Sequence, residues 1–244
     1  MLKMLDAKAV QTFKRGPFRI QRIRPGAMVG SGEELALGPL SVVDHATLEV
    51  GTLVGMHQHR NDEILSYIWR GVMEHKGSNG NRIELSPHRL MLMGAGTGIE
   101  HEESSPVERV EMLQIFVRPE AEDLPPRVQF WDRPVSTAMS DWQLIAGPEA
   151  SDAPLKFRQR VMVFDIHARA GEQLEVPTEP GITPWVYLID GTLTAGDKQL
   201  NPGDALADSD APLPPLNIER DAMLVAILVD TTAHASRAGT VSGL

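Results

Sequence analysis

Apolar residues in this chain occur in short runs that glycine and proline residues separate. Examples are LSVVDHATLEV (residues 40–50), EILSYIW (63–69) and VEMLQIFV (110–117). Short β-prone runs with alternating apolar and polar positions, bounded by turn residues, are typical of strands. The pattern therefore predicts an all-β chain of many short strands, with few short helices.

Turn residues divide the first half of the chain into successive strands. Residues 13–24, FKRGPFRIQRIR, suggest a first strand with basic side chains, and EILSYIW ends at Gly71 before the next strand, VMEHKGS. The SNGN sequence (78–81) is a strong hairpin signal, because Asn-Gly accepts the positive φ angles of tight turns. RIELSPHRLMLMGAG then predicts a strand, a turn at the proline and another strand.

The second half repeats the order of the first. Residues 119–160 begin with the acidic, proline-rich PEAEDLPPRVQFWDRP, which we interpret as a connection between domains. Strand patterns then return in WQLIA, VMVFDIHA, PWVYLIDGTLTA and LNIERDAMLVAILVD, where YLIDG corresponds to the earlier YIWRG. We therefore predict two β-barrels from an internal duplication, over residues 1–125 and 126–244. The tail after Asp230 is expected to be loose or to form a short docking arm.

The composition limits the classes of function. Among 244 residues, 33 Asp and Glu outnumber 23 Lys and Arg, and the net charge of −10 argues against direct binding of nucleic acid. The absence of cysteine excludes disulfides and thiolate ligands, so His and carboxylate are the strong metal ligands left. Because no apolar run reaches about 18 residues and no signal-peptide pattern is present, we expect a cytoplasmic protein without a membrane span.

Five side chains in the first half have the spacing of a metal site. His57 and His59 lie two apart in a segment predicted as a strand, so both leave the same face. His101 and Glu103 repeat this spacing later in the chain, and Glu63 follows four residues after His59. Imidazole and carboxylate groups from two paired strands can converge on one ion. Three histidines with one carboxylate favour Fe(II), Mn(II), Ni(II) or Zn(II), with positions open for water, substrate or O2.

These residues stand in a pattern that resembles a known family. A Gly, five residues, His-x-His, three or four residues, a Glu and a later Gly form the cupin pattern, which matches Gly51, His57, His59, Glu63 and Gly71. The resemblance to the two motifs of the pirin family is closer. It lies in the segments HQHRNDEILSYIWRGVMEHKGSNGNR and GAGTGIEHEE. The similarity extends over nearly the whole chain, through the segments GPLSVVD, LPPRVQF and WQLIAGPEA. The resemblance implies a bicupin, with two cupin (jelly-roll-like) β-barrels.

The resemblance also implies a ligand set. Pirins bind one metal, usually iron, in the N-terminal barrel through three histidines and a glutamate, and these roles fall on His57, His59, His101 and Glu103. Two segments depart from the family pattern. PHR (87–89) replaces a Pro-Gly-Asp turn, and RND (60–62) replaces a Gly and an aromatic residue at the expected pocket rim. The second departure leaves the choice of substrate open.

The other candidate residues keep alternatives open. Glu63 is a ligand in many cupins but not in pirins, so we expect it beside the metal as a candidate base, with coordination as the alternative. The GAGTG sequence is expected to allow close backbone approach rather than to bind a dinucleotide. The second barrel has no His-x-His and is expected to be structural. The remaining histidines are expected to be structural or solvated: His45, His75, His88, His167 and His234.

Two functions of different classes fit this pattern. Some bacterial pirins resemble quercetin 2,3-dioxygenase, which opens a flavonol ring with O2. In such a reaction the metal would bind substrate oxygens, and Glu63 or Glu103 would accept the hydroxyl proton. The alternative is a metal-dependent, redox-responsive regulatory protein that binds a protein partner without turnover, as eukaryotic pirin does with transcription factors. A metal-binding fold without activity is a third hypothesis.

Overall fold

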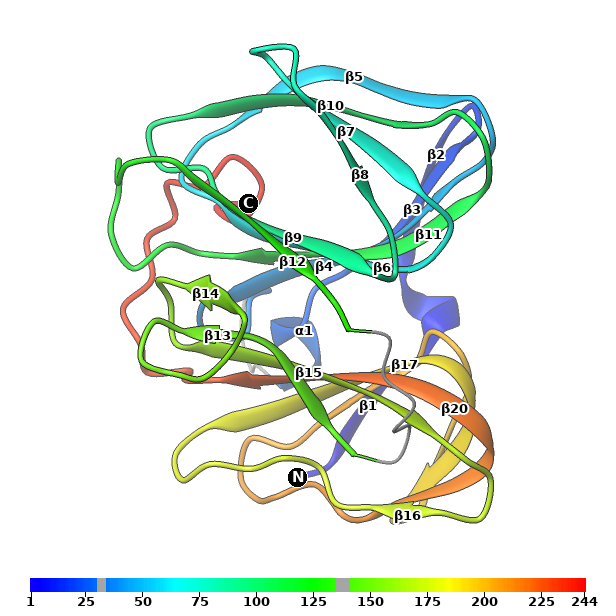
Figure 1. Ribbon diagram of the computed structural model, residues 1–244. Coiled ribbons are helices and arrows are strands. Elements are labelled where there is room, and N and C mark those ends of the chain that lie inside the picture. Colours follow the sequence, from blue (N-terminus) through cyan, green and yellow to red (C-terminus); the bar gives the residue numbers. More distant parts are fainter. Residues whose placement is uncertain (30–33, 135–140) are drawn as a thin grey trace.

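Three β-sheets contain nearly all of the regular secondary structure of the described residues (Figure 1). The computed structural model describes residues 1–29, 34–134 and 141–244, and within these ranges the helices are α1 (Gly26–Val29) and the 3-10 helix η1 (Ala7–Ala9). The all-β prediction is therefore confirmed. No helix in the described ranges has the length and apolar character needed to span a membrane.

The first half is a sandwich of two antiparallel sheets. In neighbour order, the seven-stranded sheet contains β12 (Arg127–Asp132), β9 (Arg89–Gly94), β6 (Glu63–Arg70), β11 (Val110–Val117), β4 (Leu40–Leu48), β3 (Phe18–Ile23) and β2 (Gln11–Arg15). The four-stranded sheet contains β5 (Thr52–His59), β10 (Ile99–Ser105), β7 (Met73–Gly77) and β8 (Arg82–Leu85). In Figure 1 the four-stranded sheet lies at the top and faces the seven-stranded sheet in the middle.

The second half is one nine-stranded sheet, at the bottom of Figure 1. Its main path contains β1 (Lys3–Leu5), β19 (Ala205–Ala207), β17 (Thr183–Ala195), β20 (Leu216–Val229), β15 (Val161–Ala168), β13 (Gln143–Pro148) and β14 (Leu155–Phe157). Two short strands complete it, β16 (Gln173–Leu174) on β20 and β18 (Lys198–Leu200) on β17. β13 and β15 coincide with the predicted WQLIA and VMVFDIHA strands to within two residues.

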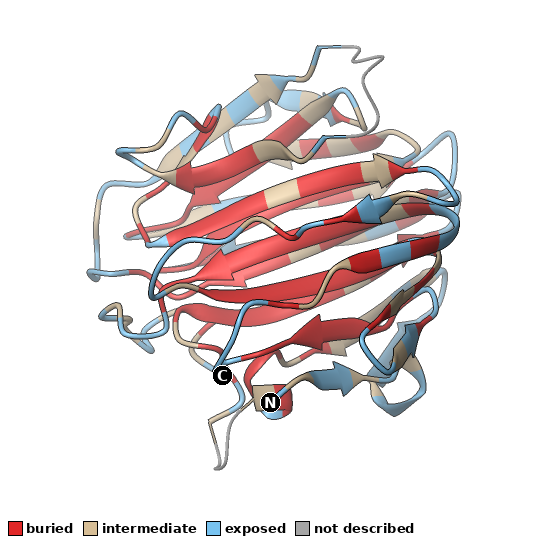
Figure 2. Ribbon diagram, turned by 90° about the horizontal axis from the view of Figure 1, so that it is seen from below, coloured by how far each residue is buried: buried red, intermediate tan, exposed pale blue. Residues whose placement is uncertain are grey.

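The central strands of the seven-stranded sheet, β9, β6, β11 and β4, are mostly buried, whereas β2 at its edge is exposed. Figure 2, in which the molecule is seen from below, shows buried residues along most of its strands. On β6, Ile64 and Ile68 pack in clusters between the two sheets of the first half. Leu65 and Tyr67 point the other way, into a core shared with Trp185 and other residues of the second half. Burial of both faces explains why EILSYIW is an almost continuous apolar run.

A buried polar network joins the two halves through that shared core. Tyr67 Oη donates to Asp165 Oδ2 at 2.7 Å, and Arg133 Nη2 donates to Asp165 Oδ1 at 2.6 Å. Nearby, His45 Nδ1 lies 2.7 Å from Tyr187 Oη. His45 is thus structural, as expected, because its hydrogen bond crosses between the halves.

Two segments differ from the sequence prediction. Residues 13–24 do not form one strand, because Gly16 turns the chain with a φ of 59° and β2 pairs back on β3. The segment interpreted as a connection contains β12, which pairs with β9 in the first sheet. The SNGN hairpin is confirmed: β7 and β8 are antiparallel, and Gly80 has a φ of 83°.

The two halves exchange strands near their ends. β1 belongs to the second-half sheet, where Met4 pairs with Leu206, whereas β12 belongs to the first. The boundary between residues 125 and 126 stays a prediction. Of the two expectations for the tail after Asp230, the loose tail is wrong and the short docking arm is confirmed. It returns to the first half, where Ser242 is fully buried, and the C-terminus lies beside that half in Figure 1.

Candidate metal centre

Three histidines meet between the two sheets of the first half. His57 and His59 lie on β5, and His101 lies on the neighbouring β10, where the register pairs it with His57. The ring centroids are 4.4 Å apart for His57 and His101, 5.0 Å for His57 and His59, and 5.2 Å for His59 and His101. One nitrogen from each ring lies within 4.8 Å of the others. Convergence of imidazoles from adjacent strands is suited to one metal ion.

Hydrogen bonds turn one nitrogen of each β5 histidine away from the cluster. His57 Nδ1 lies 2.9 Å from the Gly55 carbonyl oxygen, and His59 Nδ1 lies 3.0 Å from Asp62 Oδ2. A carbonyl oxygen and an ionised carboxylate only accept, so each Nδ1 donates and each Nε2 keeps a lone pair for a metal. His101 Nε2 is buried without a hydrogen-bond partner, a cost that coordination would remove.

Burial favours the neutral form of His57, His75 and His101, which is the form that binds metals. Desolvation, reinforced by the neighbouring histidines, lowers the pKa of His101 to about 2. Desolvation also lowers the pKa of His57 and of His75 below the ordinary value of 6.5. Neutral imidazoles, among them the unpartnered His101 Nε2, fit a divalent transition metal.

His75 joins the cluster, which the sequence did not predict. Its strand β7 pairs with β10 so that His75 lies opposite Glu103, and His75 Nδ1 is 3.2 Å from His101 Nδ1. His75 is buried rather than solvated. The sequence did contain a signal for the burial of His75. This residue lies two positions after the apolar Met73, and residues two apart on a strand share a face.

Glu103 is buried on the same side of β10 as His101, as their spacing predicted. Its carboxylate forms a second group of possible ligands with His75 and His101, within 4.8 Å. Gln114 Nε2 donates to both of its oxygens, at 2.9 and 3.1 Å. Desolvation raises the pKa of Glu103 to about 7, although His59 and the Gln114 hydrogen bond act to lower it.

Glu63 lies apart from the histidines. It shares a face of β6 with Leu65 and Tyr67, toward the second half, and its Oε1 accepts a hydrogen bond from the Arg158 backbone N–H at 3.0 Å. Its Oε2 is buried without a partner, and desolvation raises its pKa to about 7. The expected position beside the metal is not the one observed, because the parity of β6 turns this side chain to the opposite face.

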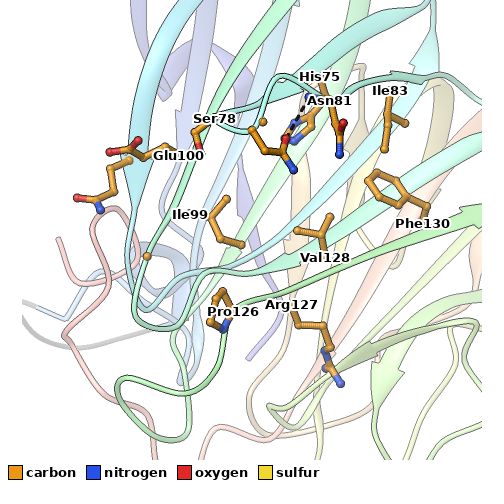
Figure 3. Close-up of a pocket in the computed structure, with 14 residues that line it drawn as sticks. His75, Ser78, Asn81, Ile83, Ile99, Glu100, Pro126, Arg127, Val128 and Phe130 are labelled. Carbon is orange, nitrogen blue, oxygen red and sulfur yellow. Dashed lines mark hydrogen bonds between the residues drawn. The ribbon is translucent and has the colours of Figure 1, made fainter.

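Openings lie at both edges of the sandwich. The pocket in Figure 3 has a volume of about 590 Å³ and lies between β8, β10 and β12, with His75 at its wall. Ile83, Ile99, Val128 and Phe130 face this pocket. At the other edge, a groove of about 1210 Å³ runs between the β2–β3 hairpin and β5 and reaches His57. The histidine cluster is therefore flanked by two possible entrances.

The RND segment, expected at the pocket rim, is buried in part. Asn61 and Asp62 are 3% and 0% exposed, and only Arg60 is exposed. Asn61 has a φ of 56°, a left-handed conformation that Asn tolerates better than most residues. This tight turn after β5 directs the Asp62 carboxylate to His59.

Comparison with known proteins identifies the family. A family model of pirin matches residues 27–117, and a model of the quercetinase C-terminal cupin domain matches residues 144–231, so the matches cover both halves in order. The chain is a member of the pirin family. This confirms the resemblance seen in the two motifs.

Curated relatives of this pirin carry an enzyme name. The quercetin 2,3-dioxygenase of Escherichia coli K12 is 29% identical over 175 residues, which are 71% of this chain and 74% of the relative. A putative quercetin 2,3-dioxygenase of Pasteurella multocida is 31% identical over 159 residues, 62% of this chain and 66% of the relative.

Solved structures confirm the bicupin fold of this pirin. YhhW of Escherichia coli superposes with a TM-score of 0.84 at 24% identity, covering 96% of this chain and all of the other. The complex of the bacterial pirin YhhW with nickel(II) gives 0.81 at 24% identity, covering 94% and 99%. Quercetin 2,3-dioxygenase of Acinetobacter baumannii gives 0.75 at 20% identity, covering 95% and 86%.

Proposed function

We propose that this pirin binds one divalent transition metal and acts as an O2-dependent dioxygenase on a flavonol-like, quercetin-type substrate. The observation that carries the proposal is the orphaned His101 Nε2 within a cluster of three histidines. Fe(II) is our first choice of metal, with Mn(II), Ni(II) and Zn(II) as alternatives. The relatives named quercetin 2,3-dioxygenase support the reaction class, and the nickel(II) complex of YhhW supports a divalent ion. The ligands would be His57, His59, His101 and Glu103.

The metal, when bound, supplies a Lewis acid for the substrate oxygens and access to O2 chemistry. The chain's own residues must remove the substrate's hydroxyl proton and hold the aromatic rings. Glu103 suits the first task, because its buried carboxylate lies beside His101 and can accept a proton. Gln114 fixes the orientation of this carboxylate. We assign proton transfer to Glu103 rather than Glu63, whose carboxylate faces the second half.

The pocket in Figure 3 suits a flat aromatic molecule. Ile83, Ile99, Val128 and Phe130 offer apolar walls, and the Asn81 and Arg127 side chains add polar groups at its edge. A volume of about 590 Å³ lies within the range of small-molecule sites. We therefore propose that the aromatic substrate enters between β8 and β12 and approaches the metal past His75.

Turnover after anaerobic loading tests this function. Tag-free protein loaded with Fe(II) should consume O2 with quercetin and release a ring-opened product and carbon monoxide. The matched control is the His57→Ala, His59→Ala variant, which should show neither metal nor turnover. One bound metal per chain without product, across all four candidate metals, would overturn the enzyme proposal and favour the regulatory alternative.

A further inference from the structure

The last nine residues form an ordered arm across the first half. This C-terminal arm, residues 236–244, follows β20 and runs beside the turn after β5. Thr240 exchanges hydrogen bonds with Arg60: its N–H donates to the Arg60 carbonyl at 3.0 Å, and its Oγ1 accepts from the Arg60 N–H at 2.8 Å. The Ser242 carbonyl accepts from Ser41 Oγ at 2.7 Å and from Arg118 Nε at 3.0 Å. Contacts to three segments of the first half hold the arm in place.

One buried carboxylate connects the arm to the histidine cluster. Asp62 Oδ1 accepts from Ser242 N–H at 2.9 Å and from Ser242 Oγ at 2.7 Å, and Val241 N–H lies 3.2 Å from both Asp62 oxygens. The other oxygen, Oδ2, accepts from His59 Nδ1 at 3.0 Å. Asp62 is fully buried, so these donors replace water around its charge. The arm therefore donates most of the hydrogen bonds to the Asp62 carboxylate, which in turn accepts the hydrogen bond from His59.

The C-terminal arm also packs closely against the residues around Asp62. A Cβ atom at Gly239 would overlap Asp62 Oδ1 and Ser242 Oγ, so this approach requires glycine. Val241 packs on a cluster that includes Ile64 and Phe116, and the Phe116 ring lies 6.0 Å from the His59 ring. The arm thus supports His59 through a hydrogen-bonded path and an apolar path.

We propose that the C-terminal arm is a positioning element of the metal site, acting through Asp62 on His59. The proposal deepens the function proposed above and rests on the metal site assigned there. Without the arm, the Asp62 carboxylate loses its donors and must turn toward water, so it no longer fixes the tautomer and orientation of His59. Partners that orient a metal-binding histidine are worth about 10- to 100-fold in metal affinity.

The test measures Co(II) binding, by affinity and by the visible absorption that reports ligand geometry. A chain ending at Ala238 should bind Co(II) about 10- to 100-fold more weakly, with a shifted spectrum. Ser242→Ala should show a smaller change in the same direction, because backbone donors to Asp62 remain, and Ser242→Thr should restore affinity. The matched control is Ser236→Ala in the same arm, whose hydroxyl donates to the exposed Glu122 rather than to Asp62. This variant should bind as the unaltered chain does.

The outcomes separate the two proposals. If the unaltered chain does not bind Co(II), the metal site itself is refuted. If it binds, and both the shortened chain and Ser242→Ala keep its affinity and spectrum, the positioning role of the arm is refuted while the metal site stands. If the shortened chain does not fold, the pair Ser242→Ala and Ser236→Ala decides, since equal affinities would refute the role and a loss at Ser242 alone would support it.

Discussion

Metal affinity should depend on pH through Glu103, and the structure gives the size of the effect. Without metal, burial raises the pKa of Glu103 to about 7, so the proton competes with the ion below that pH. The apparent dissociation constant should rise by the factor 1 + 10^(pKa − pH), which increases about 100-fold from pH 8 to pH 5 for a pKa of about 7. His101 contributes little in this window, because its pKa of about 2 keeps it neutral throughout.

The variant that isolates this effect is Glu103→Gln, which removes the titrating group and a proposed ligand. It should bind the metal more weakly than the unaltered chain at pH 8, and the difference should shrink by about 100-fold toward pH 5, where the unaltered carboxyl is protonated. Competition titrations with a chromophoric chelator in non-coordinating buffers, at half-unit steps of pH, measure both curves. Parallel curves would refute the reasoning, because they would mean that Glu103 is not a ligand or does not titrate in this window.

Three further predictions follow from other residues. His57→Ala with His59→Ala should abolish metal retention, measured by elemental analysis, and about one equivalent left in the variant would contradict the site. Glu63→Gln should stabilise the metal-free protein at pH 8 by about 3 kcal/mol at most, and should have no such effect at pH 4. The reason is that the folded-state pKa of Glu63 is raised from 4.5 to about 7, so ionising this carboxyl group costs stability as the pH rises through that range. Equal denaturation curves for both proteins at pH 8 would refute this. Phe130→Ala should raise KM for quercetin about 2- to 10-fold at unchanged metal content. Phe13→Ala, in the opposite groove, is its control, and a rise there instead would move the substrate entrance to that edge.

Features that depend on neighbours along the chain could be predicted from the sequence. His57 and His59 share a face because they lie two apart on one strand, and His101 and Glu103 do so for the same reason. The SNGN turn needs only local backbone geometry, and it forms where expected. For the same reason, strands such as β6, β11, β13 and β15 form where turn residues and short apolar runs predicted them.

Features that depend on distant segments could not be predicted in this way. His75 reaches His101 only through the register of β7 on β10. Glu63 is turned away by a hydrogen bond from Arg158, 95 residues later, and by the parity of β6. Asp62 finds its partner in Ser242, 180 residues along the chain. The RND sequence itself does not indicate whether Asp62 is buried or lies at the pocket rim, because the C-terminal arm is what buries this residue.

The burial of the central strands of the seven-stranded sheet on both faces has a consequence for any shortened form of the chain. The strand that presents Ile64 toward the histidine side presents Leu65 and Tyr67 toward the second half. A fragment carrying the first half alone would expose that apolar face to water and would also lack the arm that seats Asp62. The second half therefore acts as a cover that keeps water away from the face of the sheet opposite the histidine cluster. The first half expressed alone should be less stable and more prone to aggregate than the whole chain.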